Sequence, residues 1–162
     1  MHIRTATKKA IAACLFLVVA ALTVTAQTTY IIADQFGVKH DITKALTSGT
    51  CIIAAGNAMD APARLVRWTR MLNASALSEV PTFAVCDLSG MPFFVPKAPT
   101  IKKLQKEYPD TPILLDWKGE LAKRVSLQKS DIVVELFRDG ASIARVTGDA
   151  DAIKLLALTS GR

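Results

Sequence analysis

The chain has 162 residues, 51% of them apolar, with 20 lysines and arginines against 14 aspartates and glutamates. This length fits a single domain, and the high apolar content excludes an intrinsically disordered chain. Without residues 1–26 the formal net charge falls from +6 to +3, with 17 basic against 14 acidic residues. No cluster of basic and aromatic residues predicts a nucleic-acid interface.

The N-terminal segment 1–26 has the three-part pattern of a secretory signal peptide. A basic start precedes an apolar run over residues 10–24, and residues 24–26 (Val-Thr-Ala) supply the small residues that a signal peptidase recognises. The run of 15 residues is shorter than the roughly 20 that span a bilayer. We therefore expect cleavage after this segment, a mature domain over residues 27–162, no stable membrane span in it, and a periplasmic or secreted location.

Three cysteines occur in the sequence. Cys14 follows a lipobox-like Ile-Ala-Ala, but basic residues precede that box, so we expect Cys14 to be removed with the signal. Export permits a disulfide between Cys51 and Cys86. The first begins one predicted strand and the second ends the next, so we expect a separation beyond disulfide reach.

The first half of the mature chain predicts a hairpin, a buried strand and a helix. Residues 28–33 and 38–42 are short extended runs around the turn Asp34–Gly37, and residues 51–55 form a continuous apolar run typical of a strand buried on both faces. A helix is predicted next from apolar residues at helical spacing and a proline suited to a first turn: Leu65, Trp68, Met71, Leu72 and Pro62.

The second half predicts alternating strands and helices that end in a hairpin. Residues 81–85 and 113–116 are apolar strands, Thr100 is a candidate cap for the helix between them, and residues 120–124 form a short helix. The second helix presents apolar residues on one face: Ile101, Leu104 and Tyr108.

A closing hairpin and a last helix complete the pattern. Asp139-Gly140 is a hairpin turn between strands over residues 132–137 and 142–146, and Asp149 is a candidate cap of the last helix. Its expected apolar face comprises Ile153, Leu156 and Ala157. Strands that alternate with helices before a terminal hairpin predict an α/β sandwich with a mixed sheet.

Three segments, in the same order along the chain, carry a resemblance to the thioredoxin-like redoxins, in the exported TlpA-type and peroxiredoxin-like branch. Asp34–His40 resembles their opening hairpin, Asp116–Ala122 their Asp-x-x-Gly-x-x-Ala segment, and Arg138–Gly148 their closing hairpin and the glycine after it. Phe94-Val95 and Tyr108-Pro109 are similar to a pattern of the periplasmic YtfJ-type subgroup. The resemblance implies a three-layer α/β sandwich with a mixed central sheet, an N-terminal β-hairpin, and a C-terminal β-hairpin plus helix.

The same resemblance implies a degenerate active site. Members of the family carry reactive cysteines where the first buried strand turns into its helix, and the helix N-terminus lowers the thiol pKa. The corresponding stretch here is Asp60-Ala61-Pro62-Ala63, so Asp60 and Ala63 stand in the two cysteine positions. Asp131 stands where the family usually has a cis-proline. Both changes predict the loss of dithiol–disulfide chemistry.

Asp60 and Cys86 each allow two interpretations. Asp60 is a replacement catalytic carboxylate or, as we favour, an N-cap with Pro62 just inside the helix. Cys86 is a reactive thiol at the edge where α/β folds place their sites, or a buried structural cysteine. Asp87 beside it disfavours the thiolate.

Cofactor and metal motifs are absent from the sequence. His40 is the single histidine of the mature chain, no cluster has zinc-ligand spacing, and no glycine-rich nucleotide motif occurs. We expect neither a metal nor another cofactor, and we assign Trp68 and Trp117 to packing.

The loop Met91–Pro96 is apolar and follows the Cys86 strand. It either covers the core or presents Met91, Phe93 and Phe94 as a binding surface. The leading hypothesis is an exported thioredoxin-fold binding or structural module without thiol chemistry, whose partner is another exported or envelope protein. The alternative is a one-cysteine thiol peroxidase or reductase that uses Cys86.

Overall fold

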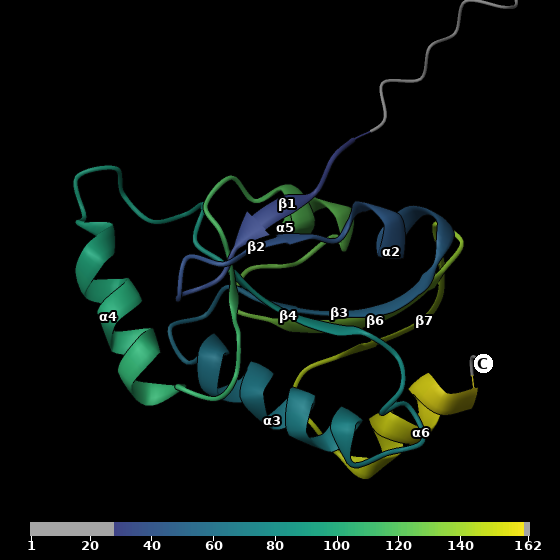
Figure 1. Cartoon of the computed structure of the whole chain (residues 1–162). Coiled ribbons are helices and arrows are strands. Elements are labelled where there is room, and N and C mark those ends of the chain that lie inside the picture. Colours follow the sequence, from purple (N-terminus) through teal and green to yellow (C-terminus); the bar gives the residue numbers. More distant parts are fainter. Residues whose placement is uncertain (1–27, 161–162) are drawn as a thin grey trace, which may run out of the picture.

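A five-stranded mixed sheet forms the centre of the computed structural model, which describes residues 28–160 (Figure 1). The strand order is β5-β4-β3-β6-β7, with β3, β4 and β5 parallel and β6 and β7 antiparallel to their neighbours. The strands are β3 (Thr50–Gly56), β4 (Thr82–Asp87), β5 (Leu114–Asp116), β6 (Ile132–Arg138) and β7 (Ala141–Thr147).

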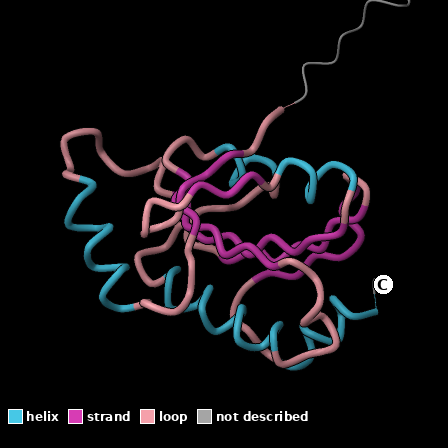
Figure 2. Tube along the Cα trace, in the orientation of Figure 1, coloured by secondary structure: helices cyan, strands magenta, loops and turns pink. Residues whose placement is uncertain are grey.

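Helices cover both faces of this sheet, which gives three layers. The first face is covered by α3 (Ala61–Asn73) and α6 (Ala152–Ser160). The other face is covered by the hairpin β1 (Ile31–Ala33) and β2 (Lys39–Asp41), together with α2 (Thr43–Ser48) and α5 (Glu120–Arg124). The remaining helix, α4 (Lys97–Glu107), stands beside the end of the sheet after a long loop from β4 (Figure 2). This is the three-layer α/β sandwich that the sequence predicts.

The central strand β3 divides its side chains between two hydrophobic cores. Ile52 and Ala54 pack with α3 and α6, while Cys51 and Ile53 pack on the opposite face with α2 and α5. These four residues are fully buried, which confirms the prediction of a strand buried on both faces. Trp68 is also fully buried, and its indole nitrogen donates to the Gly148 carbonyl oxygen at 3.0 Å.

Both predicted hairpins are present. β1 and β2 pair antiparallel with Ile32 opposite His40, and β6 and β7 pair around the Asp139-Gly140 turn. Asp139 has φ +50° and Gly140 φ +82°, as the two central residues of a tight hairpin turn require.

Three details of the helices differ from the sequence prediction. α4 begins at Lys97, so Thr100 lies inside this helix and does not cap it. Asp151 caps α6, because its Oδ1 accepts the Lys154 amide hydrogen at 2.8 Å, and Asp149 pairs with Arg64 instead. The expected apolar face of α6 is wrong as well: Ile153, Leu156 and Ala157 are exposed, and Leu158 is the residue that this helix buries.

The predicted signal peptide of residues 1–26 and Cys14 lie outside the described residues. Within residues 28–160, no helix combines the length and the apolar character that crossing a membrane requires.

Candidate functional site

The candidate site lies at the edge of the sheet where β3 and β4 end and α3 begins. Gly56 and Cys86 are register partners there, on neighbouring parallel strands. A Cβ on Gly56 would overlap the Ile132 side chain and lie 2.9 Å from the Ala61 Cβ. Glycine at this position therefore lets the start of β6, with the Asp131 carbonyl oxygen, approach Ala61 in the first turn of α3.

The start of α3 holds the four residues that the resemblance aligns with the reactive motif of the thioredoxin-like proteins. Asp60 occupies the N-cap position and Pro62 the first turn, as predicted, but the Asp60 side chain makes no capping hydrogen bond. Its carboxylate is 69% exposed and lies 3.9 Å from the Arg64 guanidinium, which pairs more closely with Asp149 at 2.6 Å. Ala61 is fully buried and Ala63 partly buried. This turn thus presents a solvated carboxylate and no thiol.

Asn57 holds the loop that carries Asp131. Its side-chain amide donates to the Gln128 carbonyl oxygen at 3.1 Å, and its Oδ1 accepts the Ser130 amide hydrogen at 2.8 Å. No peptide bond of the described residues is cis, and Ser130 adopts φ +61°. The sequence prediction missed Asn57, because the loop that its side chain holds lies 71 to 73 residues away in the sequence.

The two cysteines of the described chain are free and buried. Burial, with a smaller contribution from Asp87, raises the pKa of the Cys86 thiol to about 12. Burial also raises the pKa of Cys51 to about 11. The two residues belong to different cores on opposite faces of the sheet, so the expected absence of a Cys51–Cys86 bridge is confirmed.

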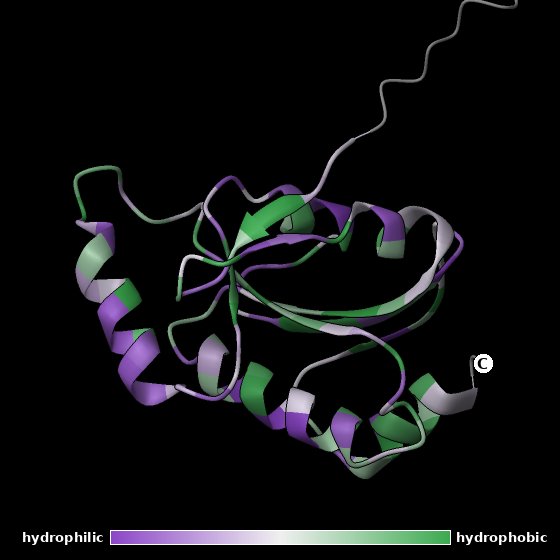
Figure 3. Ribbon diagram, in the orientation of Figure 1, coloured by the Kyte–Doolittle hydropathy of each residue, from purple (hydrophilic) through white to green (hydrophobic). Residues whose placement is uncertain are grey.

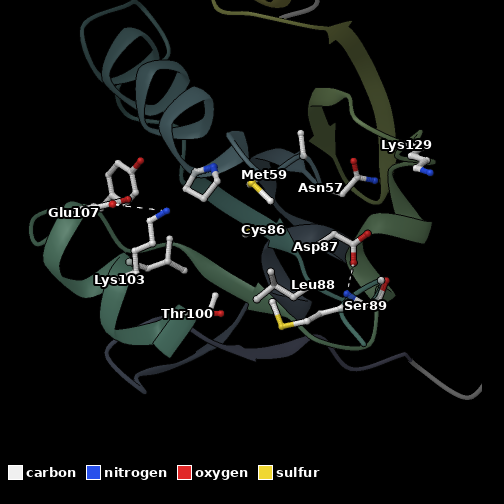
Figure 4. Close-up of a pocket in the computed structure, with 16 residues that line it drawn as sticks. Asn57, Met59, Cys86, Asp87, Leu88, Ser89, Thr100, Lys103, Glu107 and Lys129 are labelled. Atoms are coloured by element: carbon white, nitrogen blue, oxygen red, sulfur yellow. Dashed lines mark hydrogen bonds and ion pairs between the residues drawn. The ribbon is translucent and has the colours of Figure 1, made fainter. Parts of the chain in front are cut away.

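A groove of about 820 Å³ opens between the first turn of α3 and α4 (Figure 4). We call it the α3–α4 groove. Its lining includes Cys86, the residues that follow β4, and side chains from both helices and from the loop before β6. These residues are Asn57, Ala58, Met59, Pro62, Cys86, Asp87, Leu88, Ser89, Gly90, Met91, Thr100, Lys103, Leu104, Glu107, Tyr108 and Lys129.

Exposed apolar side chains stand beside this groove. Phe93 is fully exposed and Phe94 is 73% exposed, and their rings contact edge to face with centroids 5.6 Å apart. Met59 is also fully exposed, and Met91 is half-buried. The loop therefore does not cover the core, and Figure 3 shows it as an apolar segment that projects ahead of α4. Of the two interpretations of Met91, Phe93 and Phe94, the geometry is compatible with a binding surface.

His40 pairs with a buried aspartate of the N-terminal hairpin. Its Nε2 lies 2.9 Å from Oδ2 of the buried Asp34, whose Oδ1 accepts the amide hydrogens of Phe36 and Val38. Among residues 28–160, no group of three or more histidine, cysteine, aspartate or glutamate side chains is placed to hold a metal ion.

Neither a protein-family model nor a curated protein sequence matches this chain. Solved structures are similar to it in fold. The exposed lipoprotein thioredoxin Etrx1 of Streptococcus pneumoniae superposes with a TM-score of 0.61 at 13% identity, over 83% of this chain and 100% of that one. StoA of Bacillus subtilis superposes with a TM-score of 0.59 at 18% identity, over 82% of this chain and 97% of StoA. The thio-disulfide isomerase of Thermus thermophilus superposes with a TM-score of 0.54 at 20% identity, over 83% of this chain and 92% of the isomerase. Together with the topology of the sheet, these similarities show that the chain has a thioredoxin-like fold.

Proposed function

We propose that this protein is an exported thioredoxin-fold binding module that does not exchange disulfides, and that its partner is another exported or envelope protein. One observation carries the proposal. The first turn of α3, where the resemblance places the reactive cysteines, holds Asp60 and Ala63, while both cysteines of the described chain are buried elsewhere.

Thiol–disulfide exchange needs a thiolate that attacks one sulfur of the substrate and a second thiol that releases the mixed disulfide. The Asp60 carboxylate can do neither, and the Ala63 methyl group offers no second nucleophile. With a pKa of about 12, Cys86 would be ionised in about one molecule in 100,000 at pH 7.

The binding role is supported by what remains at the same edge of the sheet. A large groove adjoins this turn, and fully exposed Met59 and Phe93 stand next to it. Large apolar side chains exposed together beside a groove are typical of an interaction surface. Export is supported by the signal-peptide pattern of residues 1–26 and by the similar fold of an exposed lipoprotein thioredoxin.

A thiol enzyme that uses Cys86 is the second candidate, because this residue borders the groove. Its exposed fraction is 4%, and both its burial and the adjacent Asp87 disfavour the thiolate. A peroxide or disulfide substrate would therefore need a rearrangement of the groove before it could reach the sulfur.

Reduction of insulin by dithiothreitol tests the proposal directly. The exported protein should not accelerate the onset of turbidity above the uncatalysed rate, and it should not consume hydrogen peroxide in the presence of dithiothreitol. Cys86→Ser should behave as the parent protein in both assays. Turnover by the parent protein that disappears in Cys86→Ser would establish the one-cysteine enzyme instead.

A further inference from the structure

We propose that the α3–α4 groove binds an extended segment of the partner in which apolar side chains alternate with or flank acidic ones. This inference rests on the proposed function and names the chemistry of its ligand. Four features of the groove support it: a wall fixed at both ends, an apolar floor, exposed methionine and phenylalanine at the rim, and lysines on both sides.

The wall formed by α4 is held at both of its ends. At the N-terminal end, the Lys97 ammonium group lies 4.4 Å from the centre of the Trp117 ring. At the C-terminal end, Gln105 donates to the Gln35 carbonyl oxygen at 2.7 Å, and the Gln35 side chain donates to the Tyr108 carbonyl oxygen at 3.1 Å. Leu104, between them, is buried in the core. A groove that is already shaped costs less conformational entropy when a flexible ligand binds.

The floor and rim of the groove are apolar. Cys86, Leu88 and Leu104 lie along it, and most of the surface that it offers a ligand is carbon and sulfur. A smaller pocket of about 300 Å³ next to it shares Leu88, Ser89 and Met91, so the apolar surface continues toward Phe93. About 820 Å³ is the size of pocket that encloses a ligand of several side chains. Methionines at its rim can adapt to side chains of different shape.

The charges around the groove favour acidic side chains in the ligand. Lys103 on α4 and Lys129 on the loop before β6 line the groove on opposite sides (Figure 4). The lining also holds two carboxylates: Asp87 accepts the Ser89 amide hydrogen at 2.9 Å, and Glu107 pairs with Lys103 at 3.9 Å. Within the lining itself the positive and negative charges therefore balance.

The excess of positive charge comes from α4 as a whole, which forms one wall of the groove. α4 contains four lysines and one glutamate. Within residues 28–160, neither Lys102, Lys106 nor Lys129 forms an ion pair with another side chain, and the exposed Asp60 lies near Arg64. Lysine side chains within about 10 Å of a ligand attract acidic groups even where no direct contact forms.

Selection from a phage-displayed library of random 12-residue peptides tests the proposal, because such a library offers the groove many ligand chemistries at once. The immobilised exported protein should enrich peptides that combine large apolar residues with aspartate or glutamate. The most enriched peptide, synthesised with a fluorescent label, should bind by fluorescence anisotropy, and its affinity should fall as the salt concentration rises.

Matched variants then locate the site. Lys103→Glu with Lys129→Glu should weaken binding of that peptide at least tenfold, and Met59→Ala should weaken it several-fold without loss of fold, because this side chain is fully exposed. Lys44→Glu with Lys123→Glu makes the same change of net charge at exposed positions on α2 and α5, in the opposite layer, and should leave the affinity within twofold.

Three outcomes would overturn the inference: enrichment of basic or purely apolar peptides, no enrichment above the support, or equal loss of affinity in the two double variants. Concentration-dependent dimerisation in sedimentation velocity that Met59→Ala abolishes would assign the groove to a second copy of the chain and would also overturn it. None of these results bears on disulfide exchange. The proposed loss of thiol chemistry fails separately, through turnover in the insulin assay.

Discussion

The Gln35 side chain donates a hydrogen bond to the Tyr108 carbonyl oxygen at 3.1 Å and thereby connects the N-terminal hairpin to the end of α4. The same side chain donates to the Thr111 carbonyl oxygen and accepts the Ile113 amide hydrogen. Gln35 is 1% exposed. Its side-chain amide supplies the hydrogen bonds that three backbone groups between α4 and β5 would otherwise make with water. One buried residue in the first hairpin thus fixes the wall of the α3–α4 groove.

Replacement of Gln35 by methionine, which has a similar volume, should lower the free energy of unfolding by about 3 kcal/mol, because it leaves three backbone groups without their partner. Urea denaturation measures this loss. Gln105→Met is the control: its side chain makes one hydrogen bond and is half-buried, so it should cost less than about 1 kcal/mol. Equal stabilities of the two variants would contradict the structural role of Gln35.

Local sequence patterns predicted the strands and hairpins well, because the residues that determine each of these elements are neighbours in the sequence. The run over residues 51–55 is apolar at every position, and Asp139-Gly140 suits the tight turn between its strands. The start of α4 differs from the prediction because proline is tolerated in the first turn of a helix, where its missing N–H has no partner to lose. Pro99 therefore lies inside the first turn of α4 and does not precede the helix.

The features that the sequence did not predict depend on contacts between residues that are far apart in the sequence. Asp149 does not cap α6, because Arg64, 85 residues away in the sequence, binds its carboxylate at 2.6 Å. The side chain of Asn57 and the loop that it holds are 71 to 73 residues apart, so no local pattern could connect them. The exposure of Phe93 and Phe94 is one of two interpretations that the sequence allows, since an apolar loop alone does not reveal what it packs against.

Gly140→Val should destabilise the protein by about 2 kcal/mol or more. The residue has φ +82°, which a β-branched side chain adopts only with strain, and a Cβ would lie 3.2 Å from the Thr47 carbonyl oxygen. The melting temperature measures the effect. Gly90→Ala is the control, since a Cβ there meets no atom within 4 Å and should change stability by less than about 0.5 kcal/mol. An unchanged melting temperature of Gly140→Val would mean that the turn is built differently.

The two thiols should make the protein less stable in alkali. Burial raises the pKa of Cys51 to about 11 and, together with Asp87, that of Cys86 to about 12, whereas an unfolded cysteine ionises near pH 8.5. The unfolded chain therefore releases these protons first, so the stabilising effect is complete below about pH 8.5 and is lost as the pH rises toward about 11 and 12.

Urea denaturation between about pH 8 and pH 10.5 measures this dependence. The slope for each thiol approaches about 1.4 kcal/mol per pH unit, and Cys51→Ala with Cys86→Ala should give a flatter curve than the parent protein. In the folded parent protein, both thiols should react with a thiol reagent at pH 8 only at the rate of unfolding. Parallel curves, or rapid labelling of the native protein, would contradict the burial of the two cysteines.

Asp34 should contribute stability that is lost in acid. Burial alone would raise its pKa, but hydrogen bonds from His40 and from the amides of Val38 and Phe36 outweigh burial and lower the pKa below 3.8. A lowered folded pKa means that the stabilisation is present above about pH 4 and declines as the pH falls through the folded value.

Asp34→Asn should therefore be less stable than the parent protein at pH 6, and the difference should shrink toward pH 2. Chemical denaturation across this range measures it. Asp110→Asn, at an exposed position in the turn after α4, should follow the parent protein at every pH. A stability difference for Asp34→Asn that does not vary with pH would show that the carboxylate charge is unimportant.

The first turn of α3 should gain thiol chemistry when cysteines are placed at the two positions that the resemblance aligns with the reactive pair. Asp60→Cys with Ala63→Cys places two thiols three residues apart at the N-terminus of a helix, where the helix dipole lowers the pKa of the first. The attacking thiolate of residue 60 forms a mixed disulfide with insulin, and the thiol of residue 63 displaces the reduced chain and leaves an intramolecular disulfide, which dithiothreitol reduces again. We expect weak but measurable acceleration of insulin reduction, limited by Asp131, which the resemblance places where the family usually has a cis-proline.

Two variants separate this result from the mere presence of thiols. Asp60→Cys alone can attack but cannot resolve, so after incubation with insulin in the absence of dithiothreitol it should accumulate as a mixed disulfide that mass spectrometry detects. Lys103→Cys with Lys106→Cys has the same spacing on the exposed surface of α4 and lacks the helix N-terminus, so it should be slower than the α3 variant. Equal rates for the two double variants would mean that the start of α3 does not favour a thiolate, and would contradict the assignment of this turn to the cysteine positions of the thioredoxin-like proteins.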